Sequence, residues 1–294
     1  MSGARMHDGE VVTDVDLVRR LLGAQFPRWA DLPVHPVSSA GTNNAIYRLG
    51  DDLVVRLPRI ADTVEQVEFE YRWLPRLAAH SPVAVPEPVA QGVPADGYPW
   101  PWAVNRWLPG RTAEVADGGG AAVATDLGGF VAALRRADPS GARQGYRSGP
   151  LRGRDALVRQ WTAAARGLVD ADAVLAAWEE ALAVPDWDGP PVWTHGDLLP
   201  GNLLVDDGRL VGVIDFGAAG VGDPACDALP AWTLFDPPAR EMFRAAAGFD
   251  DETWARGRGW ALTFVSAVTY YRHTNPVMAA LGRRAVDAVL TDRL

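Results

Sequence analysis

The stretch from residue 192 to residue 217, VWTHGDLLPGNLLVDDGRLVGVIDFG, constrains the fold of this chain more than any other segment. It contains two apolar runs, Asn202–Val205 and Leu210–Ile214, joined by Asp206-Asp207-Gly208-Arg209. Apolar runs separated by Asp-Gly predict a β-hairpin with a tight turn. His195-Gly196-Asp197 precedes the hairpin and Asp215-Phe216-Gly217 follows it. We therefore expect Asp197, Asn202 and Asp215 at one end of a small sheet.

Oxygen ligands clustered in this way suit Mg²⁺, which prefers a few carboxylate or carbonyl oxygens together with phosphate oxygens. The alternative is an ordinary surface hairpin with acids at its ends by chance. The spacing resembles the H-x-D-x-x-x-x-N and D-F-G elements of the protein-kinase-like fold. With Gly196 between His195 and Asp197, the segment is similar to the aminoglycoside phosphotransferase family of small-molecule kinases.

This resemblance implies an α+β, two-lobed, protein-kinase-like fold. An N-terminal lobe, residues 1–107, would bind the nucleotide with an antiparallel sheet and one main helix, and would end in a hinge. A mostly helical C-terminal lobe, residues 108–294, would carry the catalytic hairpin and bind the acceptor. Asp197 would be the catalytic base, Asn202 and Asp215 would hold Mg²⁺, and ATP or GTP would donate the phosphate. We interpret His195 as a structural residue that fixes the loop.

A run of small polar residues in the N-terminal part is a candidate phosphate loop. Its backbone N–H groups could form a concave nest, with hydroxyls helping, although a plain turn is the simpler interpretation from the residues alone. The family uses a similar loop here. The candidate phosphate-binding residues are Ser38, Ser39, Gly41, Thr42, Asn43 and Asn44.

The strand that follows, LVVRL at residues 53–57, carries Arg56 where the resemblance expects a phosphate-binding lysine. All 28 basic residues of the chain are arginine, and arginine keeps the charge with a larger, bidentate fork. A solvent-facing arginine on an alternating strand is the alternative. The resemblance pairs Arg56 with Glu70 of the next helix, with Glu68 as the competing partner.

The segment AVNRWLPG at residues 103–110 resembles the family's hinge between lobes, whose backbone would read the edge of a purine. Asn105 and Trp107 are the hinge candidates. The apolar side chains of Val54, Val104 and Ile214 could form the walls that pack against the base.

Composition limits the class of protein. With 294 residues, 48% hydrophobic and 22% charged, the chain is expected to fold into two globular lobes. A net charge of −9 argues against a nucleic-acid partner, because phosphate neutralisation needs a basic face. The single cysteine, Cys226, excludes an internal disulfide. A polar N-terminus and the lack of long apolar runs predict a cytoplasmic protein without a membrane partner.

Apolar spacing predicts helices over Asp14–Leu22, ended by Gly23, and over Thr63–Ala79, kinked or ended by Pro75. It further predicts the helices Ala122–Arg136, Arg154–Leu168 and Ala171–Leu182. We expect Asp223 to cap a helix and Asp227 to brace the catalytic loop.

Two features of the second half bear on the acceptor. Between Arg166 and Arg209 there are acids but no basic residue, which describes either a solvated face or an acidic lip for a cationic substrate. The acids of this interval that precede residue 192 are Asp170, Asp172, Glu179, Glu180, Asp186 and Asp188. The C-terminal part is aromatic instead of acidic, and one or two of its rings could stack on a sugar or apolar ring. These rings are Trp232, Phe235, Phe243, Phe249, Trp254, Trp260, Phe264, Tyr270 and Tyr271.

The sequence thus favours transfer of a γ-phosphate to a hydroxyl of a small molecule, an antibiotic of the aminoglycoside, nucleoside or macrolide type. One alternative is a metabolite kinase of the same fold that acts on a small alcohol. Another is a nucleotide-binding pseudokinase, supported by the missing lysine and opposed by the presence of Asp197, Asn202 and Asp215.

Overall fold

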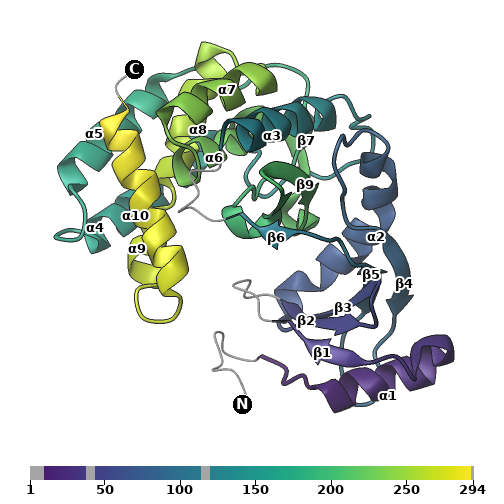
Figure 1. Ribbon diagram of the computed structural model, residues 1–294. Coiled ribbons are helices and arrows are strands. Elements are labelled where there is room, and N and C mark those ends of the chain that lie inside the picture. The colour runs from purple at the N-terminus through teal and green to yellow at the C-terminus, as the bar shows by residue number, and fades with distance from the viewer. Residues whose placement is uncertain (1–9, 38–43, 114–119, 293–294) are drawn as a thin grey trace. The chain divides into compact units, whose positions relative to one another are not determined.

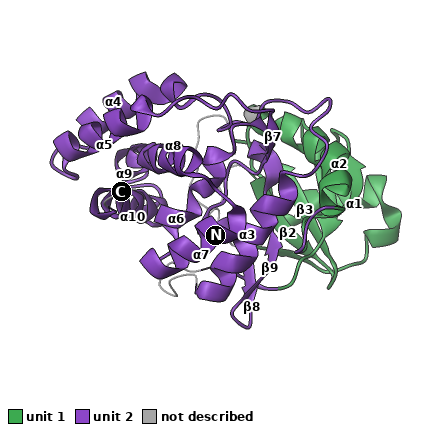
Figure 2. Cartoon of the chain, turned by 90° about the horizontal axis from the view of Figure 1, so that it is seen from above, with its two compact units in different colours: residues 1–79, 84–109 green, residues 80–83, 110–294 purple. Residues whose placement is uncertain are grey.

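The computed structural model describes residues 10–37, 44–113 and 120–292. The chain divides into two compact units, residues 1–79 with 84–109 and residues 80–83 with 110–294 (Figure 2). The assignment of a nucleotide-binding lobe to residues 1–107 and a catalytic lobe to residues 108–294 stays a prediction.

Unit 1 is built on a five-stranded antiparallel sheet with the order β1-β2-β3-β5-β4 (Figure 1). One face of this sheet packs on α1 through a core that includes Leu21, Val55 and Trp102. The second helix, α2, contacts β4 and β5. The bounds are α1 Val15–Gln25, β1 Val34–Pro36, β2 Asn44–Leu49, β3 Leu53–Pro58, α2 Val64–Ala78, β4 Pro88–Gly92 and β5 Trp102–Arg106.

The sequence predicts both helices of unit 1, but α1 runs past its expected end and Pro75 does not end α2. Asp14 caps α1 as its side chain accepts from the N–H of Leu17, yet the helix continues past Gly23 to Gln25. A Cβ at Gly23 would meet nothing within 4 Å, so neither packing nor positive φ gives this glycine a role. Pro75 likewise lies inside α2, which runs on to Ala78 because Trp73, Leu74 and Leu77 bury one face of the helix.

Unit 2 is mostly helical and contains two small sheets, one of order β6-β8-β9 and one pairing β7 with β10. The strands are β6 Arg111–Thr112, β7 Val192–Thr194, β8 Leu203–Asp206, β9 Arg209–Val213 and β10 Gly220–Gly222. The helices are α3 Ala121–Leu134, α4 Asp155–Ala164, α5 Ala171–Ala183, α6 Pro230–Thr233, α7 Pro237–Ala247, α8 Asp251–Leu262, α9 Val265–Tyr270 and α10 Pro276–Thr291.

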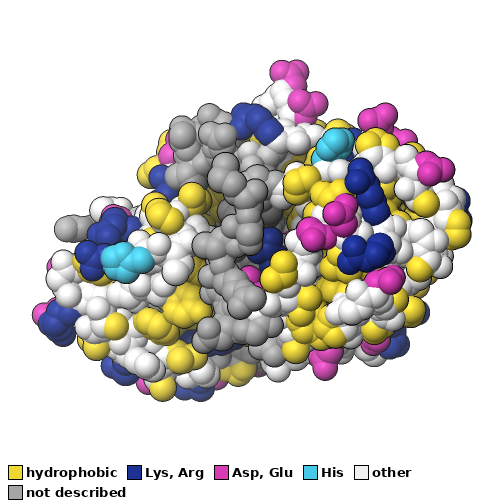
Figure 3. Space-filling view, turned by 90° about the horizontal axis from the view of Figure 1, so that it is seen from below, with side chains coloured by type: hydrophobic (Ala, Val, Ile, Leu, Met, Phe, Trp, Pro, Cys, Tyr) yellow, Lys and Arg dark blue, Asp and Glu magenta, His cyan; other side chains and the backbone are white. Residues whose placement is uncertain are grey.

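Charged side chains of both signs lie among apolar ones on the face drawn in Figure 3. Within the described ranges, the structure contains no helix that is both long and apolar enough to cross a bilayer.

Helices α3 and α7 pack closely where α3 carries two consecutive glycines, which gives a matched pair of substitutions. A Cβ at Gly128 would lie 2.6 Å from Cβ of Ala246 and 2.7 Å from the carbonyl oxygen of Phe243. A Cβ at Gly129 would meet nothing within 4 Å.

We predict that Gly128→Ala lowers the free energy of unfolding by about 1–3 kcal/mol, because the two helices must move apart. Gly129→Ala should instead raise it by roughly 0.5–1 kcal/mol through the better helix propensity of alanine. Urea unfolding followed by circular dichroism measures both. Equal stability of the two variants would contradict this packing.

Candidate functional site

The hairpin forms as its sequence predicts. Strands β8 and β9 pair antiparallel, and the turn residues Asp207 and Gly208 have φ of 44° and 72°. Positive φ at both positions is the type I′ geometry that Asp-Gly favours. Beyond the paired residues, the N–H of Ile214 donates to the carbonyl oxygen of Asn202 at 2.9 Å. This bond holds Asn202 next to the residue that precedes Asp215.

The loop after β7 is shaped by Gly196, which has φ of 75°. A Cβ at this position would lie 3.0 Å from the carbonyl oxygen of Ala218, so both conformation and space favour glycine here. The next N–H, of Asp197, donates to Nδ1 of His195 at 3.2 Å. Nε2 of His195 lies 3.1 Å from the carbonyl oxygen of Ile214. Because Nδ1 accepts, Nε2 carries the proton and donates to Ile214, so His195 links the loop to the hairpin.

Asp227 braces the same loop from beneath, as the sequence predicts. Its carboxylate accepts the N–H groups of His195 and Gly196, each at 2.8 Å, and it is 1% exposed. Burial raises the pKa of Asp227, while the two N–H donors oppose that shift. The predicted cap also forms, since Asp223 accepts from the N–H of Ala225 and additionally pairs with buried Arg256 at 2.8 Å.

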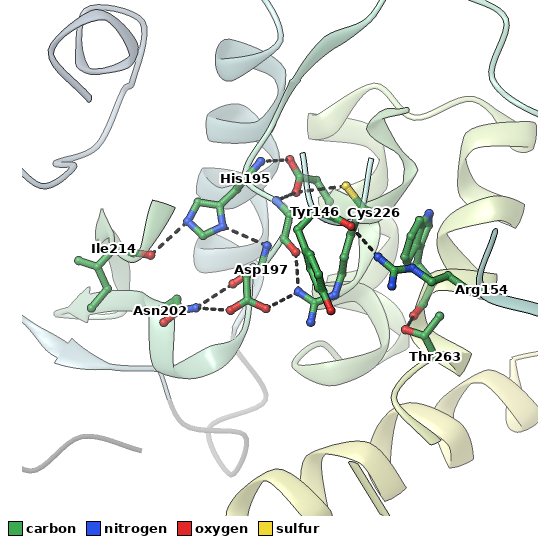
Figure 4. A network of polar contacts seen from close by, with 12 residues as sticks. Tyr146, Arg154, His195, Asp197, Asn202, Ile214, Cys226 and Thr263 are labelled. Carbon is green, nitrogen blue, oxygen red and sulfur yellow. Dashed lines mark hydrogen bonds and ion pairs between the residues drawn. The ribbon is translucent and has the colours of Figure 1, made fainter. Parts of the chain in front are cut away.

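The carboxylate of Asp197 is held on both oxygens (Figure 4). Oδ2 accepts from Nδ2 of Asn202 at 3.1 Å, and Oδ1 pairs with Nη1 of Arg147 at 2.5 Å. Arg147 also donates to the carbonyl oxygen of Gly196 at 2.7 Å. Sequence reasoning missed Arg147, because it lies in the irregular segment before α4 and carries no motif.

The donor set around the hairpin fits a magnesium ion that is shared with phosphate. Nδ2 of Asn202 faces Asp197, bonding its main-chain oxygen at 2.8 Å, so the amide oxygen of Asn202 points the other way. Asp215 adopts a left-handed backbone with φ of 65°, which costs about 1–3 kcal/mol and is typical of functional positions. No group of three His, Cys, Asp or Glu residues in the described chain could cage a metal. Mg²⁺ needs only one or two protein ligands when phosphates and water complete its shell.

In unit 1, Arg56 and Glu70 form the expected pair, with Nη1 and Oε2 2.6 Å apart. Glu70 is 5% exposed, whereas the competing Glu68 faces solvent. In the antiparallel register Val54 lies opposite Asn105, and Arg56 lies opposite Ala103. Opposed residues share a face of the sheet, so Arg56, Val54 and Asn105 lie on one face.

The residues expected to contact the base differ from expectation in two respects. Val104 is wrong as a wall of the base, because it opposes Val55 and is fully buried in the core beneath α1. Asn105 is 2% exposed, and its Oδ1 has no hydrogen-bond partner among the described residues. The N–H of Trp107 donates to the carbonyl oxygen of Asp52 at 2.8 Å, so it does not serve as a donor to a base.

Several expected phosphate-loop residues lie outside the described residues, namely Ser38, Ser39, Gly41, Thr42 and Asn43. Asn44 begins β2, opposite Pro58. In unit 2, Ile214 is half-buried, and both its backbone groups are used to join Asn202 and His195.

Unit 2 contains a pocket of about 290 Å³ that adjoins Asp197 through Arg147. Four of the aromatic residues that the sequence singles out line it, and Trp232, Phe235, Phe243, Phe249 and Trp254 are core residues instead. The aromatic lining consists of Tyr146, Trp161, Trp260, Phe264, Tyr270 and Tyr271.

The acidic run before the hairpin is used mainly for structure. Asp170 caps α5, accepting from the N–H of Ala173. Four more of these acids form ion pairs with arginines, and none of the six is among the residues that line the pocket. The pairs are Asp172 with Arg166, Glu179 with Arg159, Glu180 with Arg258 and Asp186 with Arg152.

Comparison with known proteins gives concordant results. A model described as the phosphotransferase enzyme family matches residues 34–260. An aminoglycoside 3′-phosphotransferase of Escherichia coli is 29% identical over 240 residues, covering 70% of this chain and 80% of that protein. An uncharacterized protein of Bacillus subtilis is 30% identical over 228 residues, covering 71% and 70%.

Solved structures agree. The GDP complex of a wild-type aminoglycoside 2′-phosphotransferase has a TM-score of 0.74 at 20% identity and covers 95% of this chain and 99% of its own. The macrolide 2′-phosphotransferase of Brachybacterium faecium has a TM-score of 0.62 at 26% identity, covering 96% and 99%. These matches confirm the resemblance that the motifs indicated and the expected α+β, kinase-like fold.

The bracing role of Asp227 is testable by an isosteric change. In Asp227→Asn the side chain retains one acceptor oxygen, but its NH₂ group then faces a backbone N–H that it cannot satisfy. We predict a loss of about 1–3 kcal/mol in the free energy of unfolding, measured by urea denaturation. Asp186→Asn, at the exposed ion pair with Arg152, is the control and should cost about 0–1 kcal/mol. Unchanged stability of Asp227→Asn would contradict the bracing role.

Proposed function

We propose that this chain, which belongs to the phosphotransferase enzyme family, transfers the γ-phosphoryl group of ATP or GTP to a hydroxyl of a small-molecule antibiotic. The observation that carries the proposal is the joining of Asp197, Asn202 and Asp215 by one hairpin and its hydrogen bonds. The acceptor class is proposed from the relatives, which include an aminoglycoside 3′-phosphotransferase and a macrolide 2′-phosphotransferase. Complexes of similar structures with GDP and with ATP support a nucleoside triphosphate as donor.

In the proposed reaction, Asp197 accepts a hydrogen bond from the acceptor hydroxyl and orients its oxygen towards the γ-phosphorus. A bond forms between that oxygen and phosphorus while the bond from phosphorus to the bridging oxygen breaks, and the nucleoside diphosphate leaves. The hydroxyl proton passes to Asp197. Asn202 and Arg147 each hold one oxygen of Asp197. The carboxylate is therefore already oriented before the acceptor binds, and the reaction does not have to meet the entropic cost of fixing it.

The remaining residues act on the nucleotide. The amide oxygen of Asn202 and the carboxylate of Asp215 would hold Mg²⁺, which when bound neutralises charge on the phosphates. In unit 1, Arg56, fixed by buried Glu70, would bind phosphate oxygens in place of the usual lysine. Asn105 offers a buried oxygen at the hinge, and Trp107 and Ile214 complete the nucleotide-binding candidates.

The same geometry would serve a metabolite kinase, which differs only in the acceptor. A pseudokinase is less well supported, because the base and both metal-binding side chains are present. The arginine in place of lysine is itself held by a 2.6 Å ion pair, as a functional cation would be.

Replacing Asp197 tests the base. We predict that Asp197→Asn lowers Mg²⁺-dependent transfer at least about 10²-fold, because the amide cannot take the proton, while nucleotide affinity is retained. Transfer is followed by mass spectrometry of the product, and nucleotide binding by calorimetry. Asp206→Asn, at the exposed end of β8, is the control and should behave as the wild type. Near-normal turnover of Asp197→Asn would rule out this assignment.

Replacing Arg56 tests the phosphate contact. We expect Arg56→Gln to raise the KM for ATP or GTP at least about tenfold, because it removes the charge that meets the phosphates. Arg56→Lys keeps a point charge, so its KM for the nucleotide should lie between those of the wild type and Arg56→Gln. The control is Glu68→Gln, whose exposed carboxylate lies on α2 together with Glu70, the partner of Arg56. A KM for Arg56→Gln equal to that of the control would remove Arg56 from the site.

A further inference from the structure

The pocket beside Asp197 differs in charge from what a polycationic acceptor requires. Two of the described residues that line it, Arg147 and Arg154, carry a positive charge, and none of the described lining residues is acidic. The carboxylate of Asp197, which contacts the lining residue Arg147, is already paired with it at 2.5 Å. Each ammonium group brought into this pocket would lose water, meet like charge and gain no carboxylate partner.

Arg147 connects the pocket to the base. Its guanidinium contacts Oδ1 of Asp197 and the carbonyl oxygen of Gly196, and the same side chain lies in the pocket lining. The side chain of Tyr271, at the end of α9, also lines the pocket, and burial raises the pKa of its hydroxyl with a further contribution from the charge of Asp197. A molecule in this pocket would therefore contact Arg147, the residue that pairs with the proposed base, Asp197.

Arg154 places a second charge in the same pocket. Its Nη2 donates to the carbonyl oxygen of Tyr146 at 2.6 Å (Figure 4). Its guanidinium lies 4.9 Å from the ring centre of Tyr146 and 5.6 Å from that of Trp260. The charge is therefore fixed in place by neighbouring groups.

Aromatic rings alone would also attract a cation, but several rings of this pocket already hold one. Arg147 lies over Tyr146 and Phe264, at 5.4 Å and 5.5 Å from the ring centres. The other rings form an edge-to-face series, with Trp161 6.1 Å from Tyr270 and Tyr270 4.8 Å from Tyr271. These rings present apolar surface, and a pocket of about 290 Å³ accommodates one or two rings of an acceptor.

We propose that the pocket selects a hydroxyl compound that presents an apolar or aromatic ring and carries at most one positive charge, and that Arg147 and Arg154 exclude polycations from it. This inference rests on the proposed phosphotransferase function and narrows its acceptor. Arg154 acts as a specificity-determining residue. Arg147 is in addition a positioning residue, because it acts on the reaction through Asp197.

The test compares binding and transfer for three probes: kanamycin as the polycation, erythromycin as a ring-bearing monocation, and p-nitrophenyl β-D-glucoside as an uncharged aryl sugar. Calorimetry measures the Kd of each probe with the wild-type protein, and mass spectrometry detects phosphorylated product with Mg²⁺ and ATP or GTP. We expect at least one ring-bearing probe to bind at least about tenfold more tightly than kanamycin. If kanamycin binds as tightly as the ring-bearing probes, or more tightly, the inference is wrong.

Charge reversal at Arg154 links that preference to the pocket. In Arg154→Glu, the ratio of kanamycin Kd to ring-probe Kd should fall at least about tenfold, and Arg154→Gln should give an intermediate ratio. The matched control is Arg152→Glu, two residues away on an exposed turn, where Arg152 pairs with Asp186 outside the pocket. This control should keep the wild-type ratio. An unchanged ratio in Arg154→Glu, or an equal change in Arg152→Glu, would overturn the proposal.

Arg147→Gln separates selection from positioning. We expect this variant to relax the discrimination against kanamycin and also to lower kcat for a ring-bearing acceptor, a second effect absent from Arg154→Gln. If the wild type shows neither phosphate transfer nor Mg²⁺-dependent nucleotide turnover, the proposed function is wrong. The Kd values of the three probes would still test the selectivity of the pocket. Failure of the two claims is therefore distinguishable.

Discussion

The site of unit 2 depends on the hydrogen bonds that fasten the ends of the β8–β9 hairpin to the loop before it. The N–H of Ile214 bonds Asn202, and the carbonyl oxygen of Ile214 accepts from His195. Asp197 bonds the ring of His195 with its N–H and the amide of Asn202 with its carboxylate. The proposed proton acceptor, Asp197, and the two proposed metal ligands, Asn202 and Asp215, are thereby joined to one short strand pair. Such preorganisation is what phosphoryl transfer requires, because catalysis there is mostly positioning and electrostatics.

This arrangement holds one backbone conformation that would be unfavourable on its own. Gly196 and Asp215 both have left-handed φ, which glycine adopts freely and which is costly for Asp215. The compensation comes from buried groups around them. Asp227 satisfies two backbone N–H groups, and Phe216 packs its ring 4.6 Å from that of His195. The cost of the strained loop is thus offset by contacts that also fix its functional side chains.

The sequence predicts those features whose cause is local. The hairpin follows from Asp207-Gly208 between apolar runs, and α1 begins at Val15 because the side chain of Asp14 caps it. The face of β5 was less predictable, because four of its five residues are buried and the strand lacks the alternation that would place Val104. Arg147 could not be found at all, since it meets Asp197 from 50 residues away through a segment without regular structure. Likewise, the sequence does not show that the acids of α5 pair with arginines of other elements. Without those partners, an acidic lip for a cationic substrate is one of the two interpretations.

The most direct test of the account is the position of the metal. A crystal structure of the protein with Mn²⁺ and a non-hydrolysable ATP or GTP analogue would locate the ion by its anomalous scattering. The account predicts an ion bound by the amide oxygen of Asn202 and the carboxylate of Asp215, at about 2.0–2.2 Å, with phosphate oxygens completing its shell. An ion held elsewhere in the presence of bound nucleotide, or a nucleotide whose phosphates lie away from Asp215, would contradict it.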